Sequence, residues 1–337
     1  MIRLFATALL LTALCACAPR FMAVGDHVYD ARLEREPAAD ARTVAVMPDG
    51  AALPMRVFAA ERPRAVVVAL HGFNDYSAAF AAPGPGPWFA ARGVTLYAFD
   101  QRGFGRAPGH GLWAGDERMA EDAAALVGLV RARHPGLPVY LLGTSMGGAV
   151  AMRTMTLPDP PRIDGLILAA PAVWGWREMN GLYGAALWTA AHMAPSVTLT
   201  GRGLVIMPSD NIDMLRALGR DPLVIKETRI DTIYGLVGLM DKAFAAAPRL
   251  GVPVLLLYGA NDRIVPARPM ADAVAAMRRA QVNVTALCYP GGYHMLLRDL
   301  GREAVWRDIA GWIAAPAAFA PSGAPGLRAC GDPSKGG

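Results

Sequence analysis

Short apolar runs alternate with amphipathic stretches over most of the chain. Residues 65–70 and 252–258 are continuous apolar runs, as expected for strands that a parallel sheet buries on both faces. Between such runs, apolar side chains recur at helical spacing, for example at Met119, Leu126 and Val130. This alternation predicts an α/β fold, with a mostly parallel sheet and helices on both of its faces.

The predicted core comprises residues 43–170 and 249–314. It begins with a hairpin in which residues 43–47 and 53–58 flank the turn-forming pair Asp49-Gly50. Functional groups are expected at the carboxyl ends of the parallel strands, which meet at one edge of the sheet. The remaining strands are predicted at 65–70, 94–99, 139–142, 163–170, 252–258 and 282–289, and the helices near 78–92, 116–133, 267–280 and 301–314.

Three other segments depart from this alternation. Residues 171–248 combine helical stretches with many aromatic and methionine side chains, which predicts a helical cap over the sheet. Residues 18–42 mix charged residues with alanine and lack a long apolar period, so they are interpreted as a tether. Residues 315–337 are rich in Ala, Pro, Gly and Ser, and they predict a disordered tail.

Composition narrows the class of protein. Hydrophobic residues make up 54% of the 337 residues and charged residues 18%, so the chain can bury a large core and is not globally disordered. The net charge of +5 comes from arginines scattered along the chain, and no block of Lys and Arg resembles a nucleic-acid footprint. We therefore expect no nucleic-acid partner.

Residues 1–17 predict export. Arg3 precedes an apolar run at 4–14, which is too short for a transmembrane helix and is typical of a signal peptide. The following Leu-Cys-Ala-Cys resembles the lipobox of bacterial lipoproteins, which implies lipidation of Cys17 and attachment to the cell envelope. By resemblance to Gram-negative-type lipoproteins, Ala18 implies the outer membrane. The alternative is an ordinary signal cut near Ala18, because Cys15 is unusual at its lipobox position.

Two cysteines remain after such a segment is removed, Cys288 and Cys330. An exported protein could join them as a disulfide. However, Cys288 lies in a strand-like run and Cys330 in the Pro/Gly/Ala-rich tail, so one buried thiol and one tail thiol are equally compatible with the sequence.

Residues 139–148 combine a strand, a sharp turn and a helix around one serine. The apolar run 139–142 leads into Gly-Thr-Ser-Met-Gly at 143–147, and helix-forming residues follow. A nucleophile elbow requires this order, because its serine occupies a strained turn whose neighbours leave room only for glycine. Ser145 is therefore the candidate nucleophile.

A serine nucleophile needs a histidine base, which a carboxylate orients in turn. On this fold the expected order along the chain is Ser, then Asp or Glu, then His. His294 alone of the six histidines follows the last predicted strand, and Asp262 lies just after the strand at 252–258. The predicted triad is therefore Ser145, Asp262 and His294.

Two backbone N–H groups are predicted to stabilise the oxyanion of the tetrahedral intermediate. Met146 directly follows the nucleophile, and Phe73 lies in the loop after the strand at 65–70. We interpret His71, in the same loop, as a structural residue. This chemistry implies no metal ion and no cofactor.

Several stretches together resemble α/β-hydrolases of the monoacylglycerol lipase and lysophospholipase group. The resemblance covers about residues 43–314 and implies hydrolysis of a carboxylic ester, monoacylglycerol or lysophospholipid, through an acyl-enzyme. Thr144 departs from the pattern, because many members carry His there. The stretches are, in order, His-Gly-Phe at 71–73, Asp-Gln-Arg-Gly-Phe-Gly at 100–105, Gly-Thr-Ser-Met-Gly-Gly at 143–148, Asp-Pro-Leu-Val at 221–224, Gly-Ala-Asn-Asp at 259–262 and Tyr-His at 293–294.

The predicted cap is expected to select the substrate. Its side chains could line an acyl-chain tunnel, for which the adaptable methionines are suited, or could form the core of the cap itself. A lipid anchor would place the site at a membrane surface, where monoacyl lipids are available. The candidate substrate contacts are Trp174, Trp176, Met179 and Tyr183.

Other functions on this fold are an aminopeptidase and a small-ester esterase. A third alternative, a non-catalytic envelope lipoprotein, is disfavoured because the predicted triad is complete. Dehalogenases and epoxide hydrolases are also disfavoured, since they carry a carboxylate at the elbow position that Ser145 occupies.

Overall fold

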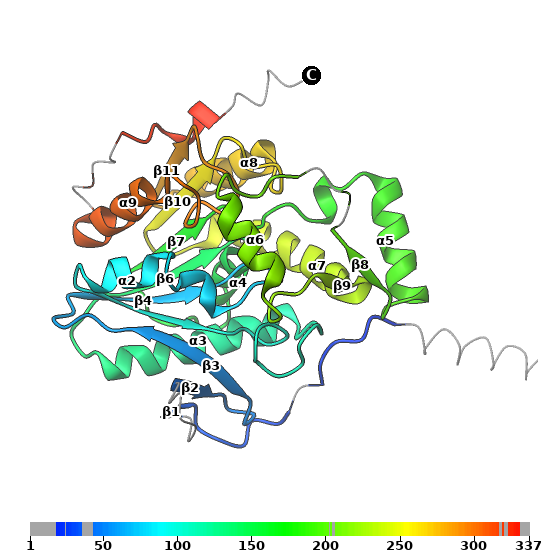
Figure 1. Ribbon diagram of the computed structural model, residues 1–337, viewed down its shortest axis with the longest axis horizontal. Helices are drawn as coiled ribbons and strands as arrows, with labels where there is room; N and C mark the ends of the chain where they lie inside the picture. Colours follow the sequence, from blue (N-terminus) through cyan, green and yellow to red (C-terminus); the bar gives the residue numbers. More distant parts are fainter. Residues whose placement is uncertain are drawn as a thin grey trace, which may run out of the picture.

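One large sheet organises the molecule (Figure 1). The computed structural model describes residues 18–23, 25–35, 43–201, 203, 206–316, 319 and 323–330. Within these ranges the sheet has nine strands in the spatial order β1-β2-β3-β5-β4-β6-β7-β10-β11. They are β1 (Arg32–Arg35), β2 (Thr43–Val46), β3 (Ala52–Phe58), β4 (Ala65–Leu70), β5 (Val94–Phe99), β6 (Val139–Thr144), β7 (Gly165–Ala169), β10 (Val254–Gly259) and β11 (Val284–Tyr289).

Strand pairing confirms the predicted hairpin and the parallel core. β2 and β3 pair antiparallel, with Thr43 opposite Met55 and Val46 opposite Ala52. The six strands after β3 are all parallel, and they are adjacent in the order β5-β4-β6-β7-β10-β11. The predicted α/β fold is therefore confirmed, and the carboxyl ends of its parallel strands share one edge.

The two faces of the sheet bury separate apolar clusters. In β4, Val66 and Val68 belong to one cluster and Val67 and Ala69 to the other, because successive side chains in a strand point to opposite faces. The first cluster packs under α3 (Asp116–Arg133), α4 (Met146–Thr154), α7 (Ile230–Ala246) and α8 (Ala267–Arg279). The second packs under η1 (Ser77–Phe80), α2 (Pro85–Ala90) and α9 (Arg302–Ala314).

The segment predicted as a cap contains two kinds of helix. Beyond η2 (Trp176–Glu178), α5 (Gly181–Met193) and the small ribbon of β8 (Thr198–Thr200) and β9 (Glu227–Arg229) lie at one end of the molecule (Figure 1). In sequence, α6 (Ile212–Arg220) lies between β8 and β9. In contrast, α7 packs against α4 and contributes Val237 and Leu239 to the main core. The structure therefore places α7 in the helical layer on the sheet, although residues 171–248 were all predicted as cap.

Both ends of the described chain are held against the core. Residues predicted as a tether include β1, which extends the sheet beside β2, and Phe21, which forms a bridge with Trp113. Within the tail predicted as disordered, η5 (Leu327–Cys330) is instead joined to β11 by a Cys288–Cys330 disulfide. A further 3-10 turn, η3 (Ala247–Arg249), precedes β10.

The predicted signal segment 1–17, including Cys17, lies outside the described residues. None of the helices that the structure describes has both the length and the apolar character of a membrane-spanning segment.

Candidate active site

Ser145 occupies a strained turn between β6 and α4. Its backbone φ of 52° and ψ of −117° lie outside the usual range of a residue with a side chain, and such conformations persist only where the surroundings impose them. The Ser145 N–H donates to the carbonyl of Ala169 at 3.0 Å, and the Ser145 carbonyl accepts from the N–H groups of Ala149 and Ala172. The turn is therefore held from both sides.

The two glycines of the pentapeptide are required by the same turn. A Cβ atom at Gly143 would collide with the backbone of Gly147, and one at Gly147 would collide with the carbonyl of Leu70 in β4. Because backbone atoms cannot move aside as a flexible side chain can, only glycine fits at either position. This is the local geometry of a nucleophile elbow.

Asp262 and His294 meet across two loops that leave neighbouring strands. Asp262 follows β10 and its carboxylate is fully buried, with Oδ1 accepting from the N–H groups of Ile264 and Val265 at 2.8 and 3.0 Å. Its Oδ2 lies 2.8 Å from Nδ1 of His294, in the loop after β11. This contact holds the imidazole with a proton on Nδ1 and leaves Nε2 as the nitrogen that can accept a proton.

A second carboxylate, which the sequence did not single out, supports the His294 loop. Asp299 is buried, accepting from the Tyr293 N–H at 2.7 Å through Oδ2 and from the Ser209 hydroxyl at 2.6 Å through Oδ1. Burial raises the pKa of Asp299, although both hydrogen bonds act to lower it. Met295 also donates its N–H to the carbonyl of Pro208. The segment before α6 is thus bound to the loop that carries His294.

The loop that carries Phe73 is held by His71. Nδ1 of His71 lies 2.8 Å from the Gly72 carbonyl, and Nε2 accepts from the N–H of Gln101 at 3.0 Å. The Gln101 side-chain amide returns a bond to the His71 carbonyl at 2.9 Å. An Nε2 that accepts a hydrogen bond carries no proton, and burial lowers the pKa of His71 in the same sense. These contacts match the interpretation of His71 as structural. Phe73 itself packs edge-on against Phe104.

A cavity of about 300 Å³ lies at this edge of the sheet, and we call it the catalytic cavity. Ser145, His294 and Phe73 line it, together with apolar side chains. Two charged residues also line it, Asp75 and Arg298, whose Oδ2 and Nη1 atoms are 2.6 Å apart. No periodic or motif signal in the sequence marks this ion pair. The remaining lining residues are Gly72, Ala79, Phe80, Thr144, Ala169, Pro208, Leu215, Leu218, Ile264, Met295, Leu296 and Leu297.

The four candidate substrate contacts in the predicted cap do not line the catalytic cavity. Trp174, Trp176 and Met179 pack against the main core, and Tyr183 is exposed on α5. The cap residues that do line the cavity are Pro208 and, from α6, Leu215 and Leu218. Helical spacing could have suggested the two leucines, because they share one face of α6.

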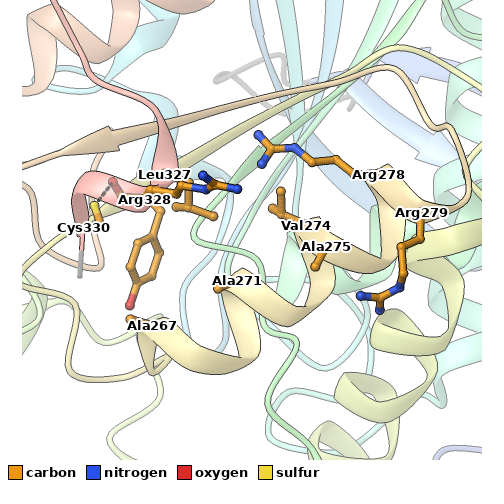
Figure 2. A pocket seen from close by; sticks show the side chains of 10 residues that line it. Ala267, Ala271, Val274, Ala275, Arg278, Arg279, Leu327, Arg328 and Cys330 are labelled. Carbon is orange, nitrogen blue, oxygen red and sulfur yellow. Dashed lines mark hydrogen bonds between the residues drawn. The ribbon is translucent and has the colours of Figure 1, made fainter. Parts of the chain in front are cut away.

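A larger cavity, of about 600 Å³, lies elsewhere, between α8 and η5 (Figure 2). Figure 2 shows Arg278 of α8 and Arg328 of η5 beside it, with Cys330 on the η5 side. None of Ser145, Asp262 and His294 lines this cavity. We therefore assign the chemistry to the smaller one.

Comparison with known families agrees with this geometry. Residues 61–301 match the family model Hydrolase_4, described as serine aminopeptidase, S33. The chain belongs to this family of α/β-hydrolases.

Known relatives narrow the class of reaction. The monoacylglycerol lipase of Mycolicibacterium smegmatis is 29% identical over 266 residues, covering 74% of this chain and 88% of the relative. Phospholipase YtpA of Bacillus subtilis is 27% identical over 264 residues, covering 75% and 96%. The crystal structure of Paleococcus ferrophilus monoacylglycerol lipase superposes with a TM-score of 0.65 at 25% identity, covering 77% and 98%. The chain is therefore a serine ester hydrolase, and the predicted resemblance to the monoacylglycerol lipase group is confirmed.

Proposed function

We propose that this hydrolase cleaves the carboxylic ester of a monoacyl lipid, monoacylglycerol or lysophospholipid, through a Ser145-His294-Asp262 triad. One observation carries the proposal. Ser145 and His294 line the same largely apolar cavity, and His294 is hydrogen-bonded to the buried carboxylate of Asp262.

The reaction begins with attack of Ser145 Oγ on the ester carbonyl, while Nε2 of His294 takes the hydroxyl proton. The N–H groups of Phe73 and Met146 stabilise the resulting oxyanion. Collapse breaks the bond to the alcohol, which leaves with the proton from His294, and the acyl group stays on Ser145. Water then attacks the acyl-enzyme by the same route. Asp262 holds the tautomer of His294 and stabilises its charged form.

The apolar lining of the cavity favours a substrate whose larger part is an acyl chain. Phe80, Leu215, Leu218 and Leu297 present apolar surface around Ser145, and burial of a methylene group contributes about 0.8 kcal/mol. The names of the relatives agree, since one is a monoacylglycerol lipase and another a phospholipase.

The proposal includes export and a lipid anchor. Residues 1–17 have the composition of a signal segment that ends in a lipobox-like sequence at Cys17. An anchor at Cys17 would hold the enzyme on the outer membrane, within reach of monoacyl lipids.

Substitution Ser145→Ala tests the proposal. Hydrolysis of monoacylglycerol and of p-nitrophenyl acyl esters should fall by about 10⁴-fold or more, because the nucleophile is lost. A fluorophosphonate probe should label the wild type and not this variant. Ser196→Ala, at an exposed serine, is the control and should retain both signals. Substantial ester turnover by purified Ser145→Ala would overturn the assignment of the nucleophile.

The description of the family model makes an aminopeptidase the second candidate. An acyl-chain series and an aminoacyl anilide separate the possibilities. Preference for medium or long acyl esters supports the lipase, preference for short esters supports a small-ester esterase, and cleavage of the anilide supports the aminopeptidase.

A further inference from the structure

The cavity between α8 and η5 takes no part in the proposed reaction, and we call it the arginine cavity (Figure 2). Its volume of about 600 Å³ lies within the range of about 300–1,000 Å³ that is usual for small-ligand sites. Such sites combine a mostly apolar lining with a few polar groups that fix the ligand. The lining of the arginine cavity includes Ala267, Ala271, Val274, Arg278, Leu327 and Arg328.

The floor of the arginine cavity is apolar. Ala267, Ala271 and Val274 follow one another at intervals of four and three residues along α8, so they share one face of that helix. Leu327 of η5 also lines the cavity and belongs to the main core. An apolar surface of this kind favours a ligand that has methylene groups to remove from water.

Arginines from two separate elements supply the charge of the cavity. Figure 2 shows the guanidinium groups of Arg278 and Arg328 pointing toward one another, whereas Arg279 points away from them. A cation at the C-terminal end of α8 is favoured by the helix dipole, but this does not explain why Arg328 reaches the same cavity from η5. Convergent guanidinium groups repel each other, and a carboxylate or phosphate that accepts hydrogen bonds from both would relieve the repulsion.

The segments around the arginine cavity are poor in carboxylates. Residues 273–298 and 309–330 contain no Asp or Glu. The one carboxylate in the sequence of α8, Asp272, lies 3.9 Å from Arg268. Within the part of the chain that the structure describes, Arg278 and Arg328 form no ion pair. Their charge is therefore available to an anion from outside this part of the protein.

The backbone around Arg328 is fixed on both sides. The Cys288–Cys330 disulfide joins η5 to β11 after this residue. Before it, the Cys288 N–H donates to the Pro325 carbonyl at 2.8 Å, and Gly326 forms a bridge with Leu287. Because η5 is held in this way without a ligand, binding would require little ordering of the chain, which favours affinity.

We propose that the arginine cavity binds a single-chain anionic lipid. The carboxylate or phosphate group lies between Arg278 and Arg328, and the hydrocarbon chain lies on the apolar face of α8. An amphiphilic anion uses both parts of the cavity, whereas a free inorganic anion would leave the apolar floor empty. The inference goes beyond the proposed function, because binding here requires no hydrolysis and neither Ser145 nor His294 lines this cavity.

The loop that carries Asp262 connects the walls of the two cavities. Tyr258 lines the arginine cavity, and its hydroxyl donates to the Val265 carbonyl at 2.7 Å. The Val265 N–H donates in turn to Oδ1 of Asp262 at 3.0 Å. Ile264, in the same loop, lines the catalytic cavity. A lipid in the arginine cavity would therefore lie close to the catalytic loops but outside the catalytic cavity.

Calorimetric titration of the full chain tests the proposal. Decanoate and decyl phosphate, each kept below the concentration at which it forms micelles, represent a fatty acid and a lipid phosphate. At least one of them should bind, its binding should weaken as salt is added, and the tighter of the two identifies the natural headgroup. Two partial ligands, 1-decanol without the charge and inorganic phosphate without the chain, should each bind more weakly by about tenfold or more.

Two variants test whether the ligand occupies this cavity. Arg278→Gln/Arg328→Gln should lower the affinity by about tenfold or more, because the charge-assisted hydrogen bonds are lost. Ala271→Phe, at a partly buried position, fills the apolar floor and should lower the affinity by a similar factor without a change of charge. The matched control, Arg268→Gln/Arg307→Gln, removes two exposed arginines that do not line the cavity and should retain the affinity of the wild type.

The proposal would be overturned if neither anion bound, or if 1-decanol or inorganic phosphate bound as tightly as the anionic lipid. Unchanged affinity in either variant would place the ligand elsewhere, the catalytic cavity included, and would also overturn it. An equal loss in the control variant would indicate a general effect of charge and would contradict a site at this cavity. Because the titrations measure no hydrolysis, an inactive wild type would contradict the proposed function alone and would leave the binding result standing.

Discussion

The buried imidazole of His71 holds the loop that carries Phe73, one of the two proposed oxyanion donors. His71 is fully buried and accepts the Gln101 N–H through Nε2. A second proton, on Nε2, would place two donors against each other and would put a charge in a fully buried site. Burial therefore lowers the pKa of His71 below its ordinary value of 6.5, although Asp100 and Asp75 nearby act to raise it.

This pKa shift predicts how stability depends on pH. Below about pH 6.5 the unfolded chain takes up a proton at His71 that the folded chain refuses, so acidification should favour unfolding. The thermal midpoint should fall as pH is lowered from 7 to 5, and it should fall less steeply in His71→Gln. His27→Gln, at an exposed position, is the control. An identical slope in wild type and His71→Gln would contradict the assignment.

At the scale of elements, an ion pair joins the two loops that carry the proposed oxyanion donor and base. Asp75 lies in the loop after β4, and Arg298 lies four residues beyond His294 in the loop after β11. Their side chains are only 10% and 17% exposed. Because a buried charge left without its partner is costly, the pair constrains the distance between the Phe73 and His294 loops more strongly than a surface pair would.

A double-mutant cycle measures this constraint. Asp75→Asn and Arg298→Gln should each lower the free energy of unfolding by about 3 kcal/mol, and each should lower kcat. The double variant should lose less free energy of unfolding than the two single variants lose together, and the coupling energy should be about 1–3 kcal/mol. The exposed pair Arg131–Asp164 is the control, with an expected coupling below about 1 kcal/mol. Additive effects at Asp75 and Arg298 would show that the pair does not act as a unit.

At the scale of the whole molecule, the disulfide joins η5, the last described segment, to the strand that leads to His294. Cys288 lies opposite Tyr258 in the parallel pair of β10 and β11, one position before each strand ends. The loops that follow these strands carry Asp262 and His294. Leu327 adds apolar contact with the main core beside the bond. The tail segment at 323–330 is thus part of the fold.

Removal of the disulfide should reduce stability. The two cysteines are 42 residues apart in sequence, and closure of a loop of that length is expected to stabilise the folded state by about 2–4 kcal/mol. Cys288→Ala/Cys330→Ala should therefore lower the midpoint of chemical unfolding by a corresponding amount. Reduction of the wild type should reproduce the loss and should leave the double variant unchanged. An unaltered midpoint in the variant would contradict a stabilising role.

The local sequence was sufficient to predict the fold class and the candidate triad. Apolar runs and helical spacing record which faces are buried, and a strained turn demands glycine at Gly143 and Gly147. Ser145, Asp262 and His294 each follow a parallel strand, and parallel strands end at one edge of the sheet. Their chain positions therefore predicted that they would lie near one another before any distance was known.

Contacts between distant segments were decided only by the tertiary structure. The Asp75–Arg298 pair spans 223 positions, and a single charged residue has no periodic pattern that names its partner. The wall of the catalytic cavity at Leu215 and Leu218 and the Cys288–Cys330 bond likewise depend on how loops and helices pack. Periodicity encodes which side of an element is buried, whereas the element that covers it is selected by packing of the whole chain.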